Sequence, residues 1–258
     1  MSASTRLYNA HTEMYRFEIL RYDATQAAPP RFQSYELEPQ RKMSVLEALL
    51  VIQSEQDPSL AFRYACRGAV CGSCAMSIDG KPQLACRVQL EGLPSRRVIL
   101  EPLPHFEVLR DLVVDMDPFW RKYERVRPWL HAEIDNARHR GMSEADRRRI
   151  DQYVNCILCG LCYAACPMLS SRQEFTGPAA LAKLYRFLVD SRERRGPETL
   201  AGEDSPEGAW VCRNITRCID VCPKQVRPTD AIAGLRRRLV AHRCKRLLSK
   251  NPDKAHED

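Results

Sequence analysis

The stretch CILCGLCYAACP, at residues 156–167, contains four cysteines in the spacing C-x2-C-x2-C-x3-C, followed by a proline. This spacing is typical of segments that hold iron–sulfur clusters through thiolate ligands. Three cysteines spaced by two wrap one face of a cluster, while the fourth is carried out of its reach and serves another cluster. A zinc site or a redox dithiol is a poor alternative, because this spacing with a trailing proline is so specific. The stretch therefore predicts a domain with two clusters and a second motif elsewhere.

The second motif is CRNITRCIDVCP, at residues 212–223, in which Ile215 stands where a cysteine is expected. The run at 156–167 is the bacterial two-cluster ferredoxin type, in which each fourth cysteine crosses to the other cluster. The crossed rule predicts a [4Fe–4S] cluster on Cys156, Cys159, Cys162 and Cys222. It leaves three thiolates for the other site, Cys166, Cys212 and Cys218. Since an apolar side chain cannot hold a fourth iron, we expect a [3Fe–4S] cluster there; a [4Fe–4S] cluster whose fourth iron binds water or a distant residue is the alternative.

A third cysteine set lies in the N-terminal part of the chain, in YACRGAVCGSC (64–74). Its spacing, C-x4-C-x2-C with a later cysteine, is that of a plant-type [2Fe–2S] ferredoxin. Glycines in such a loop let backbone N–H groups approach the charged sulfurs closely. A four-cysteine zinc site is the alternative, although zinc sites usually pair two C-x2-4-C knuckles. The predicted ligands are Cys66, Cys71, Cys74 and Cys86.

Composition restricts the class of protein further. The chain has 258 residues, 12 cysteines and a formal net charge of +7. Its first residues, MSASTRLYNAHTEMYRF, show no secretory signal, which favours metal-binding over disulfide-bonded cysteines. Apolar stretches such as VLEALLVI (45–52) are too short to span a bilayer. Basic runs at 147–149, 192–195 and 236–238 are interpreted as solvated helix faces, with contact to an anionic surface as the alternative and nucleic acid disfavoured.

The pattern along the chain predicts an α+β protein. We expect a [2Fe–2S] domain over residues 1–110, a connecting segment over 111–142 and a helical two-cluster domain over 143–258. Strands are expected at 15–23, 31–39, 75–86 (two strands joined by an Asp-Gly turn) and 96–103. Helices are expected at 44–57 after a Ser44–Glu47 capping box, at 143–154, at 178–196 and at 229–248. In the last of these helices, Thr229 is the expected cap, and one face carries Ala231, Ile232, Leu235 and Leu239.

The cluster order and spacings resemble the iron–sulfur subunit of the succinate dehydrogenase / fumarate reductase family over nearly the whole chain. LRDLVVDM (109–116) and GPAAL…YRFLVDSR (177–192) are similar to segments of that family. CGLCYAACP and VCPKQVRPTDAI look closer to the fumarate reductase branch. No G-x-G-x-x-G fingerprint for a flavin or nicotinamide and no nucleophile–base motif is present, so no catalytic residue is predicted in this chain.

The resemblance implies a β-grasp fold for the N-terminal domain, docked to a flavoprotein subunit with covalent FAD that carries the dicarboxylate catalytic site. It also implies integral membrane anchor subunits and a peripheral location on the cytoplasmic face of the membrane. Carried over by position, the family's quinone contacts fall on Pro167, Ile215 and Arg236. Where many succinate dehydrogenases have a tryptophan, this chain has Ser170 and Ser171, and where many have a histidine it has Arg213; together with the fumarate-reductase-like motifs, these departures favour menaquinone. The alternative is an iron–sulfur subunit of another flavoenzyme with a non-quinone acceptor.

Overall fold

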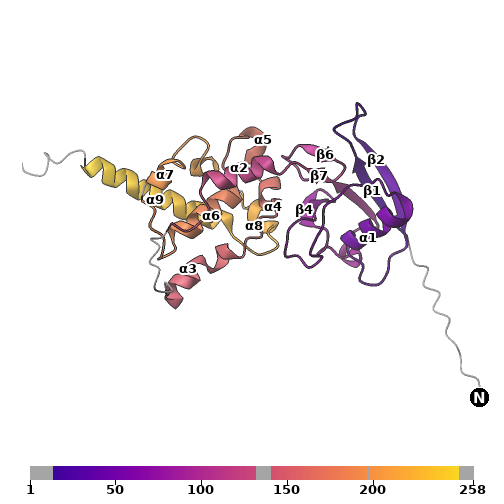
Figure 1. Ribbon diagram of the computed structural model, residues 1–258, viewed down its shortest axis with the longest axis horizontal. Coiled ribbons are helices and arrows are strands. Elements are labelled where there is room, and N and C mark those ends of the chain that lie inside the picture. The colour runs from indigo at the N-terminus through magenta and orange to yellow at the C-terminus, as the bar shows by residue number, and fades with distance from the viewer. Residues whose placement is uncertain (1–13, 132–140, 197, 250–258) are drawn as a thin grey trace, which may run out of the picture.

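The computed structural model describes residues 14–131, 141–196 and 198–249. The molecule is elongated, with a β-sheet domain at one end and a helical domain at the other (Figure 1). Within the described residues the strands are β1 (Tyr15–Arg21), β2 (Arg31–Leu37), β3 (Ala75–Ile78), β4 (Lys81–Leu84), β5 (Arg97–Glu101), β6 (Val108–Arg110) and β7 (Val113–Val114). The helices are α1 (Val45–Val51), α2 (Asp117–Arg125), α3 (Glu144–Val154), α4 (Leu161–Ala164), α5 (Met168–Ser171), α6 (Pro178–Leu188), α7 (Glu198–Ala201), α8 (Arg217–Asp220) and α9 (Pro228–Ser249).

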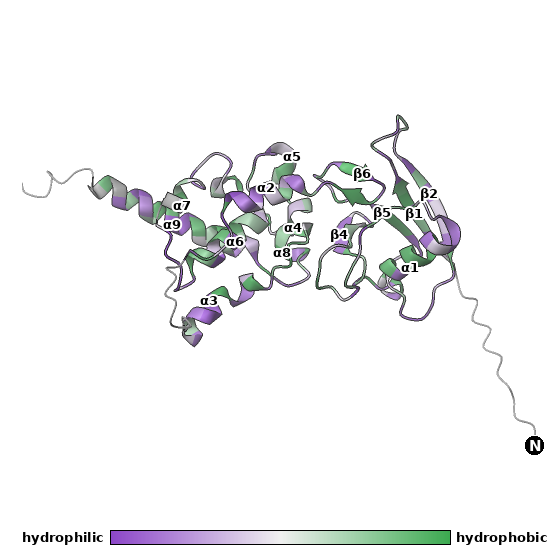
Figure 2. Ribbon diagram, viewed as in Figure 1, coloured by the Kyte–Doolittle hydropathy of each residue, from purple (hydrophilic) through white to green (hydrophobic). Residues whose placement is uncertain are grey.

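The N-terminal domain is a mixed five-stranded sheet in the order β2-β1-β5-β3-β4. Strands β1 and β2 form the predicted antiparallel hairpin, and β1 pairs with β5 in parallel. Alternation along β1 buries Tyr15, Phe17 and Ile19, as expected of a strand with one covered face. Helix α1, which is largely hydrophobic in Figure 2, belongs to the same buried cluster as these strands. This is the arrangement predicted for a β-grasp ferredoxin domain.

The start of α1 confirms the capping box read from the sequence. The Ser44 hydroxyl accepts from the backbone N–H of Glu47 at 3.2 Å, and the Glu47 carboxylate accepts from the Ser44 N–H at 2.7 Å. Two N–H groups that the helix leaves without intrahelical partners are thereby satisfied. The helix consequently starts at Val45, and its first turn is anchored beside the loop that carries Cys86, because the Leu46 N–H donates to the Ala85 carbonyl.

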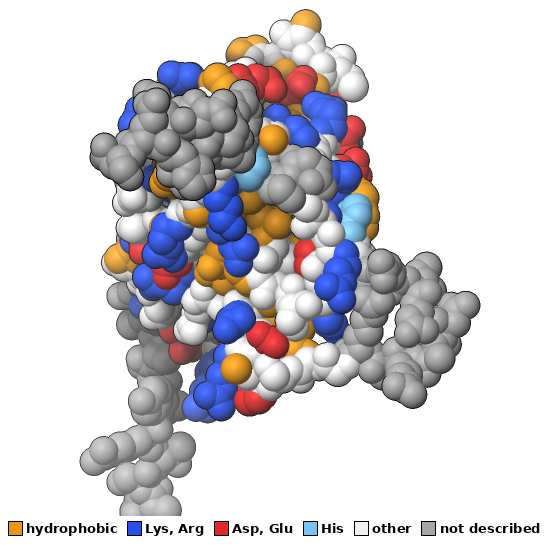
Figure 3. All heavy atoms as spheres, turned by 90° about the vertical axis from the view of Figure 1, so that its left-hand side faces the viewer, with side chains coloured by type: hydrophobic (Ala, Val, Ile, Leu, Met, Phe, Trp, Pro, Cys, Tyr) orange, Lys and Arg blue, Asp and Glu red, His pale blue; other side chains and the backbone are white. Residues whose placement is uncertain are grey.

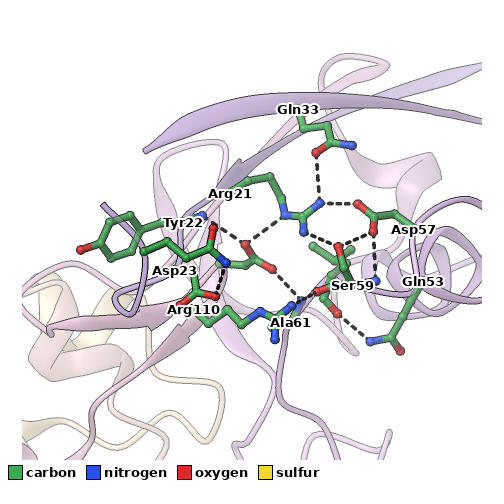
Figure 4. Close-up of polar contacts among 12 residues, drawn as sticks. Arg21, Tyr22, Asp23, Gln33, Gln53, Asp57, Ser59, Ala61 and Arg110 are labelled. Carbon is green, nitrogen blue, oxygen red and sulfur yellow. Dashed lines mark hydrogen bonds and ion pairs between the residues drawn. The ribbon is translucent and has the colours of Figure 1, made fainter. Parts of the chain in front are cut away.

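A polar network around Arg21 fastens the chain beyond β5 to the sheet (Figure 4). The Asp111 carboxylate accepts from Arg21 Nε at 3.0 Å and from the N–H of Ala61 at 2.8 Å. Arg21 also forms an ion pair with Asp57, whose side chain is 15% exposed. Although burial opposes it, hydrogen bonds from Ser59, Tyr35 and Arg21 hold the pKa of Asp57 well below its ordinary value. The boundary predicted at 110–111 falls inside the β6–β7 hairpin held here, and residues 132–140 of the predicted connecting segment lie outside the described residues. The division into domains stays a prediction.

The helical domain is built around α6 and α9. The predicted apolar face of α9 is confirmed, since Ala231, Ile232, Leu235 and Leu239 are all buried. The predicted end of α6 at Gly196 is wrong: the helix ends at Leu188. The buried Asp190 carboxylate accepts a hydrogen bond from the N–H of Arg192 at 3.1 Å and pairs with two arginine side chains. Because this side chain binds the backbone two residues on, the chain turns here instead of continuing the helix.

The two domains share a continuous apolar core. Buried residues of the sheet and of α4 and α6 belong to one cluster. The ring of Tyr163 lies 4.8 Å from that of Phe106 and 5.8 Å from that of Phe119, measured between centroids. Because Tyr163 lies within the motif at 156–167, this aromatic contact holds the helical domain's cysteine motif against the segment that leaves the sheet.

Candidate metal centres

The loop of the first cysteine set directs backbone N–H groups at its sulfurs. The Cys66 sulfur accepts from the N–H groups of Gly68, Val70 and Cys71 at 3.2–3.4 Å, and the Cys71 sulfur accepts from those of Cys66 and Ser73 at 3.4 and 3.5 Å. Positive φ angles of 55° at Arg67, 54° at Ala69 and 77° at Gly72 turn successive N–H groups inward. Such a concave backbone stabilises negative charge on sulfur.

The β3–β4 hairpin brings the other two cysteines of this set together. Cys74 directly precedes β3 and Cys86 follows β4, and the Ala85 N–H donates to the Cys74 carbonyl at 3.0 Å. Burial and the neighbouring Cys86 raise the pKa of the Cys74 thiol to about 12. By contrast, hydrogen bonds from Ser73 and the Cys66 N–H lower the pKa of Cys71 to about 6. The set therefore combines a stabilised thiolate with a buried thiol that a bound metal would keep deprotonated.

The two motifs of the helical domain have the same backbone conformation. Leu158 and Gly160 have φ angles of 56° and 77°, and the corresponding Asn214 and Thr216 have 56° and 67°. A four-residue helix follows each pair, α4 after the first and α8 after the second. Position 215 therefore has the same loop conformation as its counterpart Cys159 but carries isoleucine. The loop is kept, while the side chain at this position offers no sulfur ligand.

Two pockets divide the seven cysteines of these motifs. One is lined by Cys156, Cys159, Cys162 and Cys222, and we call it the four-thiol pocket. The other is lined by Cys166, Cys212 and Cys218 together with Ile215, and we call it the three-thiol pocket. These are the sets that the crossed rule assigns, so the residues present fit one cluster with four protein ligands and one with three.

Burial makes free thiolates costly in both pockets. It raises the pKa of Cys159 to about 12 and raises the pKa of Cys162 well above its ordinary value, with neighbouring cysteines adding to the rise. Burial likewise raises the pKa of Cys166 and Cys218. Bound metal ions supply the positive charge that holds such sulfurs in the thiolate form. Without a bound metal ion, the thiols of these pockets would therefore stay protonated.

The [2Fe–2S] loop touches the four-thiol pocket at Gly72. The spacing of the cysteines does not predict this contact. A Cβ placed on Gly72 would lie 2.6 Å from Cys159 Cβ and 2.9 Å from Cys159 Cα. Any side chain here would separate the two loops. The four-thiol pocket in turn neighbours the three-thiol pocket, because the end of α4 separates Cys162 from Cys166 and the end of α8 separates Cys222 from Cys218, with one cysteine of each pair in each pocket. The three sets therefore form a series with the four-thiol pocket in the middle.

The structure brings together two of the three residues predicted to contact quinone. Pro167 and Ile215 both line the three-thiol pocket, and Ile215 is 48% exposed. The Arg236 guanidinium instead donates to backbone carbonyls, at 3.0 Å to that of Ala209 and also to that of Cys212. Arg236 therefore holds the loop that leads into the second motif. Contact of these three residues with a quinone stays a prediction.

One polar residue at the three-thiol pocket was assigned another role from the sequence. Thr229 was expected to cap the last helix, but α9 already includes it, and its hydroxyl lies 3.2 Å from Cys218 Sγ. The capping assignment is wrong because α9 starts at Pro228, so Thr229 lies inside its first turn, where its hydroxyl contacts Cys218 of α8. One feature of the sequence does indicate this position: Thr229 directly follows Pro228 at the start of its helix, just as Ala179 directly follows Pro178 at the start of α6.

The basic runs are largely paired within the chain. Arg147 and Arg148 form ion pairs with Glu144, and Arg195 pairs with Glu193 in a buried position. Basic side chains also surround an apolar area on the helical end of the molecule (Figure 3). The exposed pairs of Arg147 and Arg148 agree with the interpretation of a solvated helix face, whereas Arg195, whose side chain is 3% exposed, is a buried structural charge. Over residues 14–131, 141–196 and 198–249, the structure has no helix that is both long and apolar enough to cross a membrane.

A β-sheet domain with one cysteine set, followed by a helical domain with two, defines an iron–sulfur protein of the electron-transfer class. Residues 16–121 match the family described as "2Fe-2S iron-sulfur cluster binding domain", and residues 152–226 match "4Fe-4S dicluster domain". The chain is 37% identical to the fumarate reductase iron-sulfur subunit of Mycobacterium tuberculosis, over 90% of this chain and 95% of that protein. It is 38% identical to the succinate dehydrogenase iron-sulfur subunit of Coxiella burnetii, over 87% and 96%.

A solved structure titled "Mycobacterium smegmatis Sdh1 complex in the apo form" contains a similar chain, with a TM-score of 0.81 and 25% identity over 90% of this chain and 97% of that one. The protein belongs to the family of succinate dehydrogenase and fumarate reductase iron–sulfur subunits, as its cysteine motifs predicted. It functions in electron transfer, as a subunit of an oxidoreductase of this family with [2Fe–2S] and [4Fe–4S] domains.

Proposed function

We propose that this subunit carries electrons between FAD on a flavoprotein partner, where succinate and fumarate interconvert, and a quinone at a membrane anchor. The observation that carries the proposal is the three-thiol pocket. It lies at the end of the series of cysteine sets, and the half-exposed Ile215 stands there where the other motif has Cys159. An apolar, accessible residue beside the last cluster site suits a hydrophobic electron acceptor such as menaquinone.

Each cysteine set has an assigned cofactor in this proposal. Iron–sulfur clusters supply one-electron transfer and no proton chemistry of their own. We propose [2Fe–2S] on Cys66, Cys71, Cys74 and Cys86, [4Fe–4S] on Cys156, Cys159, Cys162 and Cys222, and [3Fe–4S] on Cys166, Cys212 and Cys218. The chain's own part is to direct backbone N–H groups at sulfurs such as those of Cys66 and Cys71, to bury Cys74 and Cys218, and to keep neighbouring sites in contact through Gly72 and Cys159.

The proposed partners lie at opposite ends of this series. The flavoprotein with FAD docks at the N-terminal domain, next to the [2Fe–2S] loop, and the integral anchor subunits dock at the helical domain near Ile215. This subunit is then peripheral, held on the cytoplasmic face of the membrane by the anchor subunits. Similarity to iron–sulfur subunits of fumarate reductase and succinate dehydrogenase supports this arrangement.

Electron paramagnetic resonance on the purified complex tests the cluster set. We expect a narrow three-iron signal in the air-oxidised sample, and [2Fe–2S] and [4Fe–4S] signals after reduction with dithionite. A sample that is silent when oxidised would contradict the three-iron assignment. Electron transfer between the succinate/fumarate couple and the menaquinone/menaquinol couple, assayed in both directions with the membrane-bound complex, tests the two ends; reduction of a soluble acceptor only, with no response to either quinone or quinol, would favour a flavoenzyme with another acceptor.

A further inference from the structure

The hydroxyl of Thr229 contacts a cysteine of the three-thiol pocket. Thr229 Oγ1 lies 3.2 Å from Cys218 Sγ, and both residues are buried, each being 8% exposed. Once Cys218 binds iron as a thiolate, its sulfur carries no hydrogen, so the hydroxyl must be the donor. The contact is then a hydrogen bond from Thr229 to a ligand sulfur, shielded from water.

The two halves of the helical domain offer an internal comparison for this contact. Helices α6 and α9 start with GPAALA and RPTDAIA, and aligning their prolines pairs Ala179 with Thr229 and Ala182 with Ile232. Ala179 and Ala182 line the four-thiol pocket, whereas Thr229 and Ile232 line the three-thiol pocket. The repeat therefore places a methyl group at one cluster site and a hydroxyl group at the equivalent position of the other.

A hydrogen bond to a ligand sulfur affects the two redox states of a cluster unequally. Reduction adds one electron, which increases the negative charge on the sulfurs without making or breaking a covalent bond. A donor stabilises the more negative state more strongly, and hydrogen bonds to sulfur are among the determinants of cluster potential. Burial strengthens the effect, because water does not compete for the same sulfur.

We propose that Thr229 is a positioning residue that raises the reduction potential of the cluster held by Cys166, Cys212 and Cys218. This inference rests on the proposed function, since it requires an iron–sulfur cluster in the three-thiol pocket. Its consequence is directional: electrons are held more firmly at the end of the series next to Ile215, where the proposed acceptor binds. Ala179, at the equivalent position, gives the four-thiol pocket no such donor side chain.

The test is a redox titration of the purified membrane complex, followed through the oxidised three-iron signal. Thr229→Val keeps the side-chain shape and removes the donor. We expect the ratio of reduced to oxidised cluster at a fixed potential to fall about tenfold, which is about 59 mV for a one-electron couple. Thr229→Ser keeps the hydroxyl and should titrate close to the wild type, and the potentials of the other two clusters should not change.

Three results separate the possible failures. A wild-type complex without a three-iron signal refutes the proposed function before any variant is compared. An intact signal with an unchanged potential in Thr229→Val refutes the role of Thr229. If Thr229→Val fails to assemble its cluster, Ala179→Ser decides: a raised potential of the [4Fe–4S] cluster supports the inference, and an unchanged potential overturns it.

Discussion

The contact between Gly72 and Cys159 predicts a large effect from the smallest possible side chain. Gly72 has φ of 77°, and a Cβ at this position would lie 2.6 Å from Cys159 Cβ. Alanine in the left-handed region costs roughly 1–2 kcal/mol. Forcing an extra carbon into a filled contact costs about 1–3 kcal/mol more. We therefore expect Gly72→Ala to destabilise the protein by about 2–5 kcal/mol in total.

Gly80 provides a matched control for the backbone strain alone. Its φ is 73°, and a Cβ there would have no atom within 4 Å. Gly80→Ala should therefore cost only the conformational part, about 1–2 kcal/mol. The difference between the two variants isolates the contact with Cys159. Because each kcal/mol lowers the midpoint of a chain of this size by about 2–4 °C, Gly72→Ala should melt several degrees below Gly80→Ala.

The assay combines thermal unfolding, followed by the visible absorbance of the clusters, with electron transfer between the clusters. If alanine at position 72 separates the [2Fe–2S] loop from the four-thiol pocket, freeze-quench measurements should show slower transfer between these two sites. Gly80→Ala should transfer electrons at the wild-type rate, because its turn lies away from the contact. Equal melting and equal transfer rates in the two variants would refute the role assigned to this contact.

Three other predictions concern single side chains. Ile215→Cys should let the three-thiol pocket take a fourth iron, so the narrow oxidised signal disappears from the spectrum; a retained signal would show that the two motifs are wrongly aligned. Arg21→Met leaves the buried Asp111 carboxylate without its ion-pair partner and should cost about 3 kcal/mol in denaturant unfolding, whereas Arg16→Met, at an exposed pair, should change little. The pKa of Asp57 is lowered in the folded state, so its stabilising effect is complete above the ordinary carboxyl pKa and is lost as pH falls below about 4; the stability advantage of the wild type over Asp57→Asn should shrink over that range.

The division of cysteines between pockets could be predicted because it follows from short-range spacing. Three cysteines separated by two residues reach one cluster, and the crossing of the fourth is a property of the repeated motif. The missing fourth ligand could be predicted for the same reason, since Ile215 occupies the position in the repeat where the first motif has Cys159. The capping box at Ser44 is also local, and its side chains contact each other within one helical turn.

Features that depend on packing between distant segments could not be predicted in this way. The Gly72–Cys159 contact joins two domains, and no pattern in either motif specifies which loop faces the other. Arg236 was placed near the acceptor by position, but the carbonyls of the turn at Ala209–Val211 determine where its guanidinium points. Thr229 is expected to be a helix cap because it precedes an apolar run, whereas the packing of α8 against the start of α9 determines what its hydroxyl contacts.

The order of the sites follows from contacts and places the four-thiol pocket between the other two cysteine sets. Cys159 of that pocket touches the [2Fe–2S] loop at Gly72, and Cys162 of the same pocket is joined through the end of α4 to Cys166 of the three-thiol pocket. The cysteine sets at the two ends of the series belong to different domains, with the four-thiol pocket between them. Under the proposed function, an electron that enters at the sheet domain would therefore pass through the middle site on its way to the three-thiol pocket. Changes to Gly72 should accordingly slow transfer from the first site to the middle site, whereas changes to Thr229 should alter how firmly the electron is held at the last site.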